Sequence, residues 1–445
     1  MTTPICDFIR KYSEKATVRL HMPGHKGIGE AEKRDITEID GADSLYEASG
    51  IIAESEKNAG ALFGAHTFYS AEGSSLAIRA MLYLVSSYAK AKGEEPLIAA
   101  GRNVHKSFIS GISLLDIPVD FLVGRGASYL SCPLTTEDVS AYLDQAERLP
   151  TALYLTSPDY LGRLVDVESI ARVCHERGVL LLVDNAHGAY LKFLPVSRHP
   201  MDMGADVCSD SAHKTLHALT GAAYLHVSKN APALLRERAK DALALFGSTS
   251  PSYLILASLD KLNARLSEGY RDALCAHLSA IEACKATLTK WGYSFVGEEP
   301  MKLTIAAKAY GYTGKEMAAY LRIKGIESEF SDPDYLVLMP SPDLAEDALA
   351  RLTEAMLALP RKEALSSRPP AFSLPTPVLS PREAVLAPSE WVAVAEAEGR
   401  VLAGVTVGCP PAVPIVVSGE RINKNAAVAL MYYGFSHCLA VKEKE

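Results

Sequence analysis

One lysine stands among neighbours that suit covalent chemistry. Residues 209–216 read Ser-Asp-Ser-Ala-His-Lys-Thr-Leu, and Lys214 lies there between two predicted strands. A lysine amine can form a Schiff base with an aldehyde, and nearby hydroxyl groups can bind a phosphate on the same molecule. Ser211 and His213 are the predicted phosphate ligands. A surface lysine in a polar loop is the alternative, because Ser-x-His-Lys is not specific by itself.

One aspartate could bind the same molecule. Asp184 comes directly after the five apolar residues 179–183. A buried carboxylate without a partner costs free energy, and a protonated pyridine nitrogen would satisfy it and keep the ring an electron sink. The spacing to Lys214 suits one strand–crossover–strand unit, so both residues can lie at neighbouring strand ends. The pair predicts pyridoxal 5′-phosphate (PLP); an aspartate that caps a turn is the alternative.

Three further groups could complete a cofactor site. Gly73, Ser74 and Ser75 open a predicted helix, where amides, hydroxyl groups and the helix dipole favour a phosphate. His105 follows a predicted strand, and its imidazole could stack on the pyridine ring. His187 follows the predicted strand 179–183 and could reach the ring hydroxyl or the substrate. Plain helix capping and structural hydrogen bonding are the alternatives.

The elements that position these residues alternate between helix and strand. Residues 74–90 and 166–178 predict helices; Asp166 can cap the second, and Gly178 can end it. Short continuous apolar runs predict strands, which favours a parallel sheet covered on both faces. Ligands of such sheets bind beyond the carboxyl ends of the strands. The predicted strands are residues 96–101, 152–156, 179–183, 205–208 and 222–227.

The second half of the chain has a different pattern. Long helical stretches are predicted over residues 254–291, and a mixed region follows to residue 359, with a helix opened by Ser341 and Pro342. Prolines crowd the next interval, which predicts an extended linker. Apolar strand signals return in the tail, notably at residues 413–417.

Composition excludes several classes of protein. The formal net charge of −8 argues against a nucleic-acid or anionic-membrane partner. There is no signal-peptide pattern, and no apolar run reaches the roughly 18 residues of a membrane span. The 8 cysteines are scattered without a CxxC pair, so we expect reduced thiols, no metal site and a cytoplasmic protein.

Taken together, these segments resemble the Orn/Lys/Arg decarboxylase family, in its shorter bacterial form, over nearly the whole chain. The lysine motif at 211–216 is the most specific match. The other matching segments are residues 20–27 (Leu-His-Met-Pro-Gly-His-Lys-Gly), 35–38, 50–54, 63–75, 101–107 (Gly-Arg-Asn-Val-His-Lys-Ser), 248–253, 409–414 and 419–421.

The resemblance implies an α/β fold of PLP fold type I, with a mainly parallel seven-stranded sheet and smaller α+β C-terminal domains. It implies decarboxylation of arginine, lysine or ornithine to a polyamine-pathway amine, with Lys214, His105 and His213 as catalytic residues. Ser248 would reach the phosphate across the interface of a homodimer or higher assembly. His25 would be a substrate residue, and either Glu420 or an acidic residue from a neighbouring subunit would bind the distal basic group of the substrate. The implied domains are an N-terminal segment (1–55), a PLP-binding domain (56–253), a small domain (254–365) and a C-terminal decarboxylase domain (366–445).

Several positions depart from the family pattern close to the expected substrate site. Glu72 stands where asparagine is usual, Asn185 where glutamate is common, and Tyr190 where histidine is frequent. Cys409, Ala412 and Ser418 replace tyrosine, glycine and proline. The alternatives are therefore a shifted substrate, another PLP reaction such as amino transfer or a lyase reaction, and a catalytically degenerate PLP-binding homologue.

Overall fold

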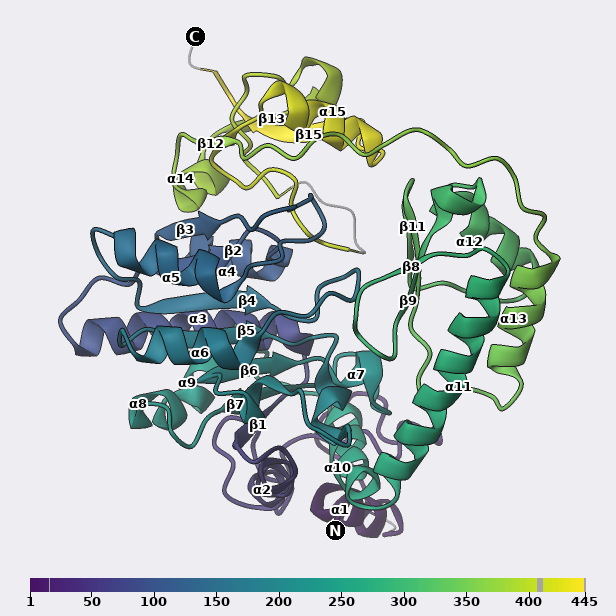
Figure 1. Cartoon of the computed structure of the whole chain (residues 1–445). Coiled ribbons are helices and arrows are strands. Elements are labelled where there is room, and N and C mark those ends of the chain that lie inside the picture. Colours follow the sequence, from purple (N-terminus) through teal and green to yellow (C-terminus); the bar gives the residue numbers. More distant parts are fainter. Residues whose placement is uncertain (16, 406–410, 444–445) are drawn as a thin grey trace. The chain divides into compact units, whose positions relative to one another are not determined.

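The short apolar runs form the central sheet of the computed structural model (Figure 1), which describes residues 1–15, 17–405 and 411–443. The strand order is β1-β7-β6-β5-β4-β2-β3. Strands β4, β5 and β6 are parallel, whereas β7 is antiparallel to both β1 and β6. The α/β fold with seven strands is confirmed, as a mixed sheet. The strands are β1 (His66–Ser70), β2 (Ile98–Gly101), β3 (Val119–Leu122), β4 (Ala152–Thr156), β5 (Leu180–Asp184), β6 (Val207–Asp210) and β7 (Ala223–Val227).

The chain divides into two compact units. Unit 1 comprises residues 1–98, 139–157 and 166–274, and unit 2 comprises residues 99–138, 158–165 and 275–445. The four domains expected from the sequence stay a prediction. The α-helices are α1 (Pro4–Ser13), α2 (Ile51–Phe63), α3 (Gly73–Ala91), α4 (Lys106–Leu115), α5 (Thr136–Gln145), α6 (Val167–His175), α7 (Ala212–Thr215), α8 (Ala233–Glu237), α9 (Ala239–Phe246), α10 (Tyr253–Ser267), α11 (Tyr270–Lys290), α12 (Gly314–Ile323), α13 (Ala348–Ala358), α14 (Pro381–Leu386) and α15 (Lys424–Tyr432).

Local sequence signals set the beginning of α6 and the turn that leads from α6 into β5. Asp166 caps α6, because its carboxylate accepts a hydrogen bond from the Ser169 amide at 3.1 Å. The chain then turns at Gly178, whose φ of +70° is a conformation that favours glycine. Strand β5 follows and is buried along its whole length, so the sequence places Asp184 at the end of a buried strand.

Unit 2 contains a four-stranded sheet and a C-terminal antiparallel pair. The order in the larger sheet is β10-β11-β9-β8, and the pair joins β13 to β15. The C-terminal pair packs with α15 around a small core that includes Leu402, Ile422 and Leu430. The remaining strands are β8 (Phe295–Val296), β9 (Leu303–Ala306), β10 (Phe330–Ser331), β11 (Tyr335–Leu338), β12 (Thr376–Pro377), β13 (Ser389–Ala393), β14 (Glu420–Arg421) and β15 (His437–Val441).

One helix prediction is confirmed and another needs correction. The long helical stretches expected over residues 254–291 are α10 and α11, which are separated at Gly269, with φ of +72°. The helix expected to open at Ser341 and Pro342 begins instead at Ala348, after Asp347. Around Ser341 the backbone makes only a turn, with the Leu344 amide donating to the Ser341 carbonyl at 3.1 Å.

The strand predicted at residues 413–417 is wrong. The Arg102 guanidinium donates to the carbonyls of Pro414 and Ile415, and the Val417 amide donates to the Glu420 carboxylate. These backbone groups therefore serve side chains, and no strand ladder includes them. The apolar residues in this segment lie in a buried loop. Hydrophobicity alone does not distinguish a buried loop from a buried strand.

No described helix combines the length and apolar character needed to cross a membrane. Each of the seven cysteines in the described ranges is free. Cys409 lies outside the described residues.

Candidate active site

Three polar side chains lie level with one another at the carboxyl ends of β4, β5 and β6. Asp184 is in register with Thr156 on one side and with Ser209 on the other. Residues in register on neighbouring strands point to the same face, so two hydroxyl groups flank the carboxylate. Asp184 accepts hydrogen bonds from the Tyr154 hydroxyl at 3.3 Å and from the Ala186 amide at 3.2 Å.

The buried environment of Asp184 disfavours its ionised form. Burial raises the pKa of Asp184 above its ordinary value, and the Lys214 charge opposes this shift. Only 2% of the residue is exposed, so water does little to solvate the carboxylate. The site therefore favours a partner that brings a proton or a positive charge to Asp184.

The predicted lysine is close to that carboxylate. Lys214 lies in α7, a single helical turn directly after β6, and its Nζ is 3.1 Å from Nε2 of His187. The turn after β5 carries His187 and the turn after β6 carries Lys214, so parallel neighbours bring the two together. The structure thus places the predicted residues Asp184, His187 and Lys214 at one strand-end site.

Predicted phosphate ligands meet beside this site. The Ser211 hydroxyl donates to Ser74 Oγ at 2.8 Å, which joins the lysine-bearing turn to the start of α3. Ser75 is next on α3, and the helix dipole adds positive potential there. At Gly73, with φ of +73°, a Cβ would meet nothing within 4 Å, so the approach to the helix start is open. This arrangement can accept an anion.

Glu72, one of the departures from the family pattern, lies at the same helix start. Its carboxylate accepts a hydrogen bond from the Ser248 amide at 2.6 Å. This contact joins the predicted phosphate residue Ser248 to the side chain of the residue that precedes Gly73. The predicted reach of Ser248 across a subunit interface stays a prediction.

Two other predicted histidines have defined hydrogen bonds in unit 1. Nδ1 of His213 is 3.0 Å from the Ala222 carbonyl, so that nitrogen carries a proton and donates. Nδ1 of His25 accepts from the Gly27 amide at 3.0 Å, and its Nε2 pairs with Asp35 at 3.2 Å. The catalytic and phosphate roles of His213 and the substrate role of His25 stay predictions.

His105 belongs to unit 2, where it caps α4. Its Nδ1 accepts from the Ser107 amide at 3.1 Å, which leaves the proton of a neutral ring on Nε2. Its predicted stacking on a pyridine ring stays a prediction.

Glu420, predicted to bind substrate, is committed to an internal ion pair of unit 2. It is 4% exposed and lies 2.9 Å from the Arg102 guanidinium. Burial raises the pKa of Glu420, and Arg102 opposes this shift. The contact geometry favours a structural role, in which the pair holds residues 414–417 against the turn that precedes His105.

Breaking this pair should destabilise the protein strongly. We expect Arg102→Met to lower the free energy of unfolding by about 3–5 kcal/mol, because it leaves a buried carboxylate without a counter-charge. Adding Glu420→Gln should restore much of the loss. Arg322→Met removes an exposed pair with Glu327 and should change stability by less than about 1 kcal/mol. Urea unfolding measures all of them, and equal effects of Arg102→Met and Arg322→Met would contradict the assignment.

Three residues of the site were not predicted from the sequence. Tyr154, Thr156 and Ser209 lie within strands, and their position beside Asp184 depends on strand register. Thr156 ends a predicted strand, which is a weak hint that a polar group faces a ligand there.

Comparison with known proteins gives a consistent result. Residues 3–295 match the family "Orn/Lys/Arg decarboxylase, major domain", and residues 364–440 match "Orn/Lys/Arg decarboxylase, C-terminal domain". The chain is 31% identical to an arginine decarboxylase of Halalkalibacterium halodurans, over 95% of this chain and 91% of the relative. It is also 31% identical to an arginine decarboxylase of Bacillus subtilis, with the same coverage of both chains.

Solved structures share the fold at low sequence identity. The lysine decarboxylase LdcF of Francisella novicida has a TM-score of 0.78 and 19% identity, covering 98% of this chain and 79% of that one. Lysine decarboxylase A of Pseudomonas aeruginosa has a TM-score of 0.78, also at 19% identity, covering 99% of this chain and 80% of that one. A serine palmitoyltransferase of Sphingomonas wittichii is more distant, with a TM-score of 0.55 at 14% identity, covering 80% of this chain and 83% of that one.

Proposed function

Because the chain belongs to the Orn/Lys/Arg decarboxylase family, we propose that it uses PLP to decarboxylate a basic L-amino acid, with L-arginine as the preferred substrate. One observation carries the proposal: Lys214 and the buried Asp184 lie close together at adjacent strand ends. An amine and an acid so placed can bind an aldehyde and a pyridine nitrogen of one small ring.

The residues present fit PLP. The hydroxyl groups of Thr156, Ser209 and Thr215 are buried and have no hydrogen-bond partner among the described residues. Buried polar atoms normally have partners, so unsatisfied ones around Asp184 and Lys214 point to a polar ligand at this place. Asp184 would hold the ring nitrogen, Lys214 the aldehyde carbon, and the α3 start with Ser74 and Ser211 the phosphate.

Each residue then has a defined task. The chemistry that PLP would supply is an electron sink for the pair released when the bond between Cα and the carboxylate breaks. Asp184 would stabilise a protonated ring nitrogen, because its buried carboxylate would gain a counter-charge there. Lys214 can deliver a proton to Cα, and His187, 3.1 Å from its Nζ, can hold or replace that proton. The protein directs the outcome by orienting the carboxylate of the substrate.

The preference for arginine rests on the two relatives named arginine decarboxylase that match nearly the whole chain. A guanidinium group calls for a carboxylate partner. Glu420 is already paired with Arg102, so an acidic residue from a second copy of the chain is the better candidate. We therefore propose a homodimer with a shared active site; the cytoplasmic location stays a prediction.

A substrate panel tests the function. Purified protein with added PLP should release carbon dioxide from L-arginine faster than from L-lysine or L-ornithine, and it should not act on D-arginine. The amine product should form in equal amount. Formation of a keto acid in the presence of an amino-acceptor would instead indicate an aminotransferase. Spectral binding of the amino acids without any turnover would indicate a degenerate homologue.

A further inference from the structure

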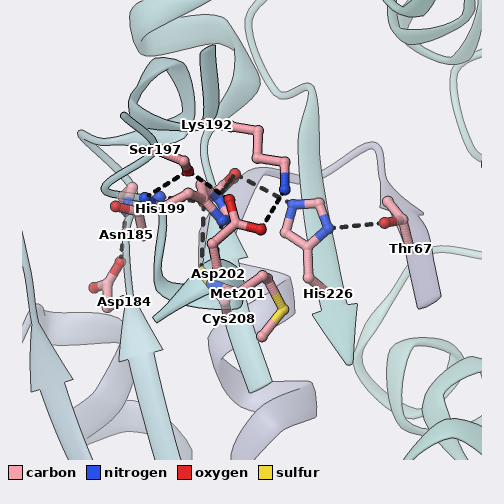
Figure 2. Close-up of polar contacts among 12 residues, drawn as sticks. Thr67, Asp184, Asn185, Lys192, Ser197, His199, Met201, Asp202, Cys208 and His226 are labelled. Carbon is pink, nitrogen blue, oxygen red and sulfur yellow. Dashed lines mark hydrogen bonds and ion pairs between the residues drawn. The ribbon is translucent and has the colours of Figure 1, made fainter. Parts of the chain in front are cut away.

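A second polar cluster surrounds Asp210, the last residue of β6, and Figure 2 labels its partners Asn185, His199 and His226. Asp210 follows Ser209 along β6 and so points to the opposite face of the sheet. It is fully buried, and Oδ2 accepts from Nε2 of His199 at 2.9 Å and from Nε2 of His226 at 3.2 Å. Oδ1 accepts from the Asn185 side-chain amide at 2.7 Å. Asp210 is therefore a buried carboxylate with both oxygens engaged.

Asp210 carries the negative charge of this cluster. Nδ1 of His199 accepts from the Met201 amide at 3.3 Å, so Nε2 is the ring nitrogen that carries a proton and donates to Asp210. Burial lowers the pKa of His226, which favours a neutral ring there. Burial also disfavours the ionised carboxylate of Asp210, but His199 and His226 outweigh this effect and hold its pKa well below its ordinary value.

A metal site is the competing interpretation of the same residues. Ligand atoms of His199, Cys208 and Asp210 lie within 4.8 Å of one another. Coordination through Nε2 of His199 would require the proton to move to Nδ1, where the Met201 amide already donates. Cys208 Sγ lies 3.6 Å from Oδ1 of Asp210 and donates to it, so the thiol already has a hydrogen-bond partner in the cluster. Hydrogen bonding explains the cluster better than metal binding.

Asp210 connects the two turns that carry the active-site groups. Through the Asn185 side chain it holds the turn that follows Asp184, which the Gly188 amide closes by donating to the Asn185 carbonyl at 2.8 Å. That turn presents His187 to Lys214. Through the chain itself, Asp210 leads directly into Ser211 and the lysine-bearing helix α7.

We propose that Asp210, held by His199 and His226, is a positioning residue that fixes the Asp184 and Lys214 turns relative to each other and places a negative charge behind them. The inference rests on the proposed function for its catalytic meaning. Its anchoring role does not depend on PLP. The charge of Asp210 also raises the pKa of Asp184. It would therefore favour a proton held between Asp184 and a ring nitrogen.

The test compares Asp210→Asn with a matched control at the other end of β6. Asp206 precedes β6, is buried, and pairs with His175 at 2.9 Å and with the Leu181 amide at 2.7 Å. Asp206→Asn therefore removes the same charge from a similar aspartate–histidine pair at the opposite end of the strand. Both variants keep the shape of the side chain, and thermal unfolding shows how far each is destabilised.

Two measurements separate anchoring from general destabilisation. In the cofactor-free full chain, Asp210→Asn should speed amide hydrogen exchange at residues 184–188 and 211–215, whereas Asp206→Asn should speed it near residues 175–182. With PLP, Asp210→Asn should weaken binding about tenfold, as expected for the loss of a charge-assisted hydrogen bond. The pH midpoint of the bound PLP absorbance should move to lower pH, because the negative charge that stabilised the protonated forms is lost. Asp206→Asn should leave both PLP properties unchanged.

The outcomes distinguish the two proposals. If Asp210→Asn exchanges faster at both turns but the parent protein does not bind PLP, the proposed function is overturned and the anchoring role stays intact. Unchanged exchange in Asp210→Asn, or equal effects of both variants on PLP, would overturn the positioning role. If the purified parent chain contains stoichiometric zinc and Asp210→Asn does not, a metal site would replace the positioning role.

Discussion

Replacing Lys214 by alanine is expected to abolish covalent PLP attachment and to lower the rate of carbon dioxide release by about a thousandfold or more. The size follows from the loss of a nucleophilic amine and of a proton donor from the same position. Borohydride treatment followed by peptide mass spectrometry should find PLP fixed to Lys214 in the parent protein. The variant should carry no such adduct.

Lys229→Ala provides the matched control, because Lys229 is an exposed lysine that follows β7 in the same unit. This variant should keep the adduct and the activity. An adduct on another lysine in the Lys214→Ala protein, with activity retained, would show that the strand-end site has been assigned to the wrong amine.

Asp184→Asn is expected to act in opposite directions on activity and on stability. The turnover number should fall by about 10²–10³-fold, because the variant loses a preorganised charge at the ring nitrogen. PLP should also bind more weakly. The cofactor-free variant should nevertheless be more stable than the parent by about 1–3 kcal/mol, because it no longer buries a poorly paired carboxylate.

The pH dependence gives this prediction a second readout. Since burial raises the pKa of Asp184 in the folded protein, the folded state holds this proton more tightly than the unfolded state. The contribution of Asp184 to stability is therefore greatest at low pH and is lost as pH rises through the raised folded-state pKa. Thermal unfolding of the cofactor-free proteins should show this loss in the parent and not in Asp184→Asn. A variant that is less stable than the parent at neutral pH would refute the account.

Local sequence determined the parts of the site that depend on neighbours along the chain. The apolar run 179–183 followed by Asp184 predicts a buried strand that ends on a carboxylate, and β5 ends there. The Ser-x-His-Lys segment between two strands predicts the turn that holds Lys214. Asp166 and Gly178 act through their own backbone neighbourhood, so their effects on α6 follow from the sequence too.

Tertiary structure alone decided which distant groups meet. Register between parallel strands sets Thr156 and Ser209 beside Asp184. Packing turns Glu420 inward to a buried ion pair with Arg102, and the role of Glu420 toward a substrate stays a prediction. Asp210 meets two histidines in the same way. Such pairings depend on burial and on chain crossings that bring remote segments together, and the periodicity of a single segment carries no information about them.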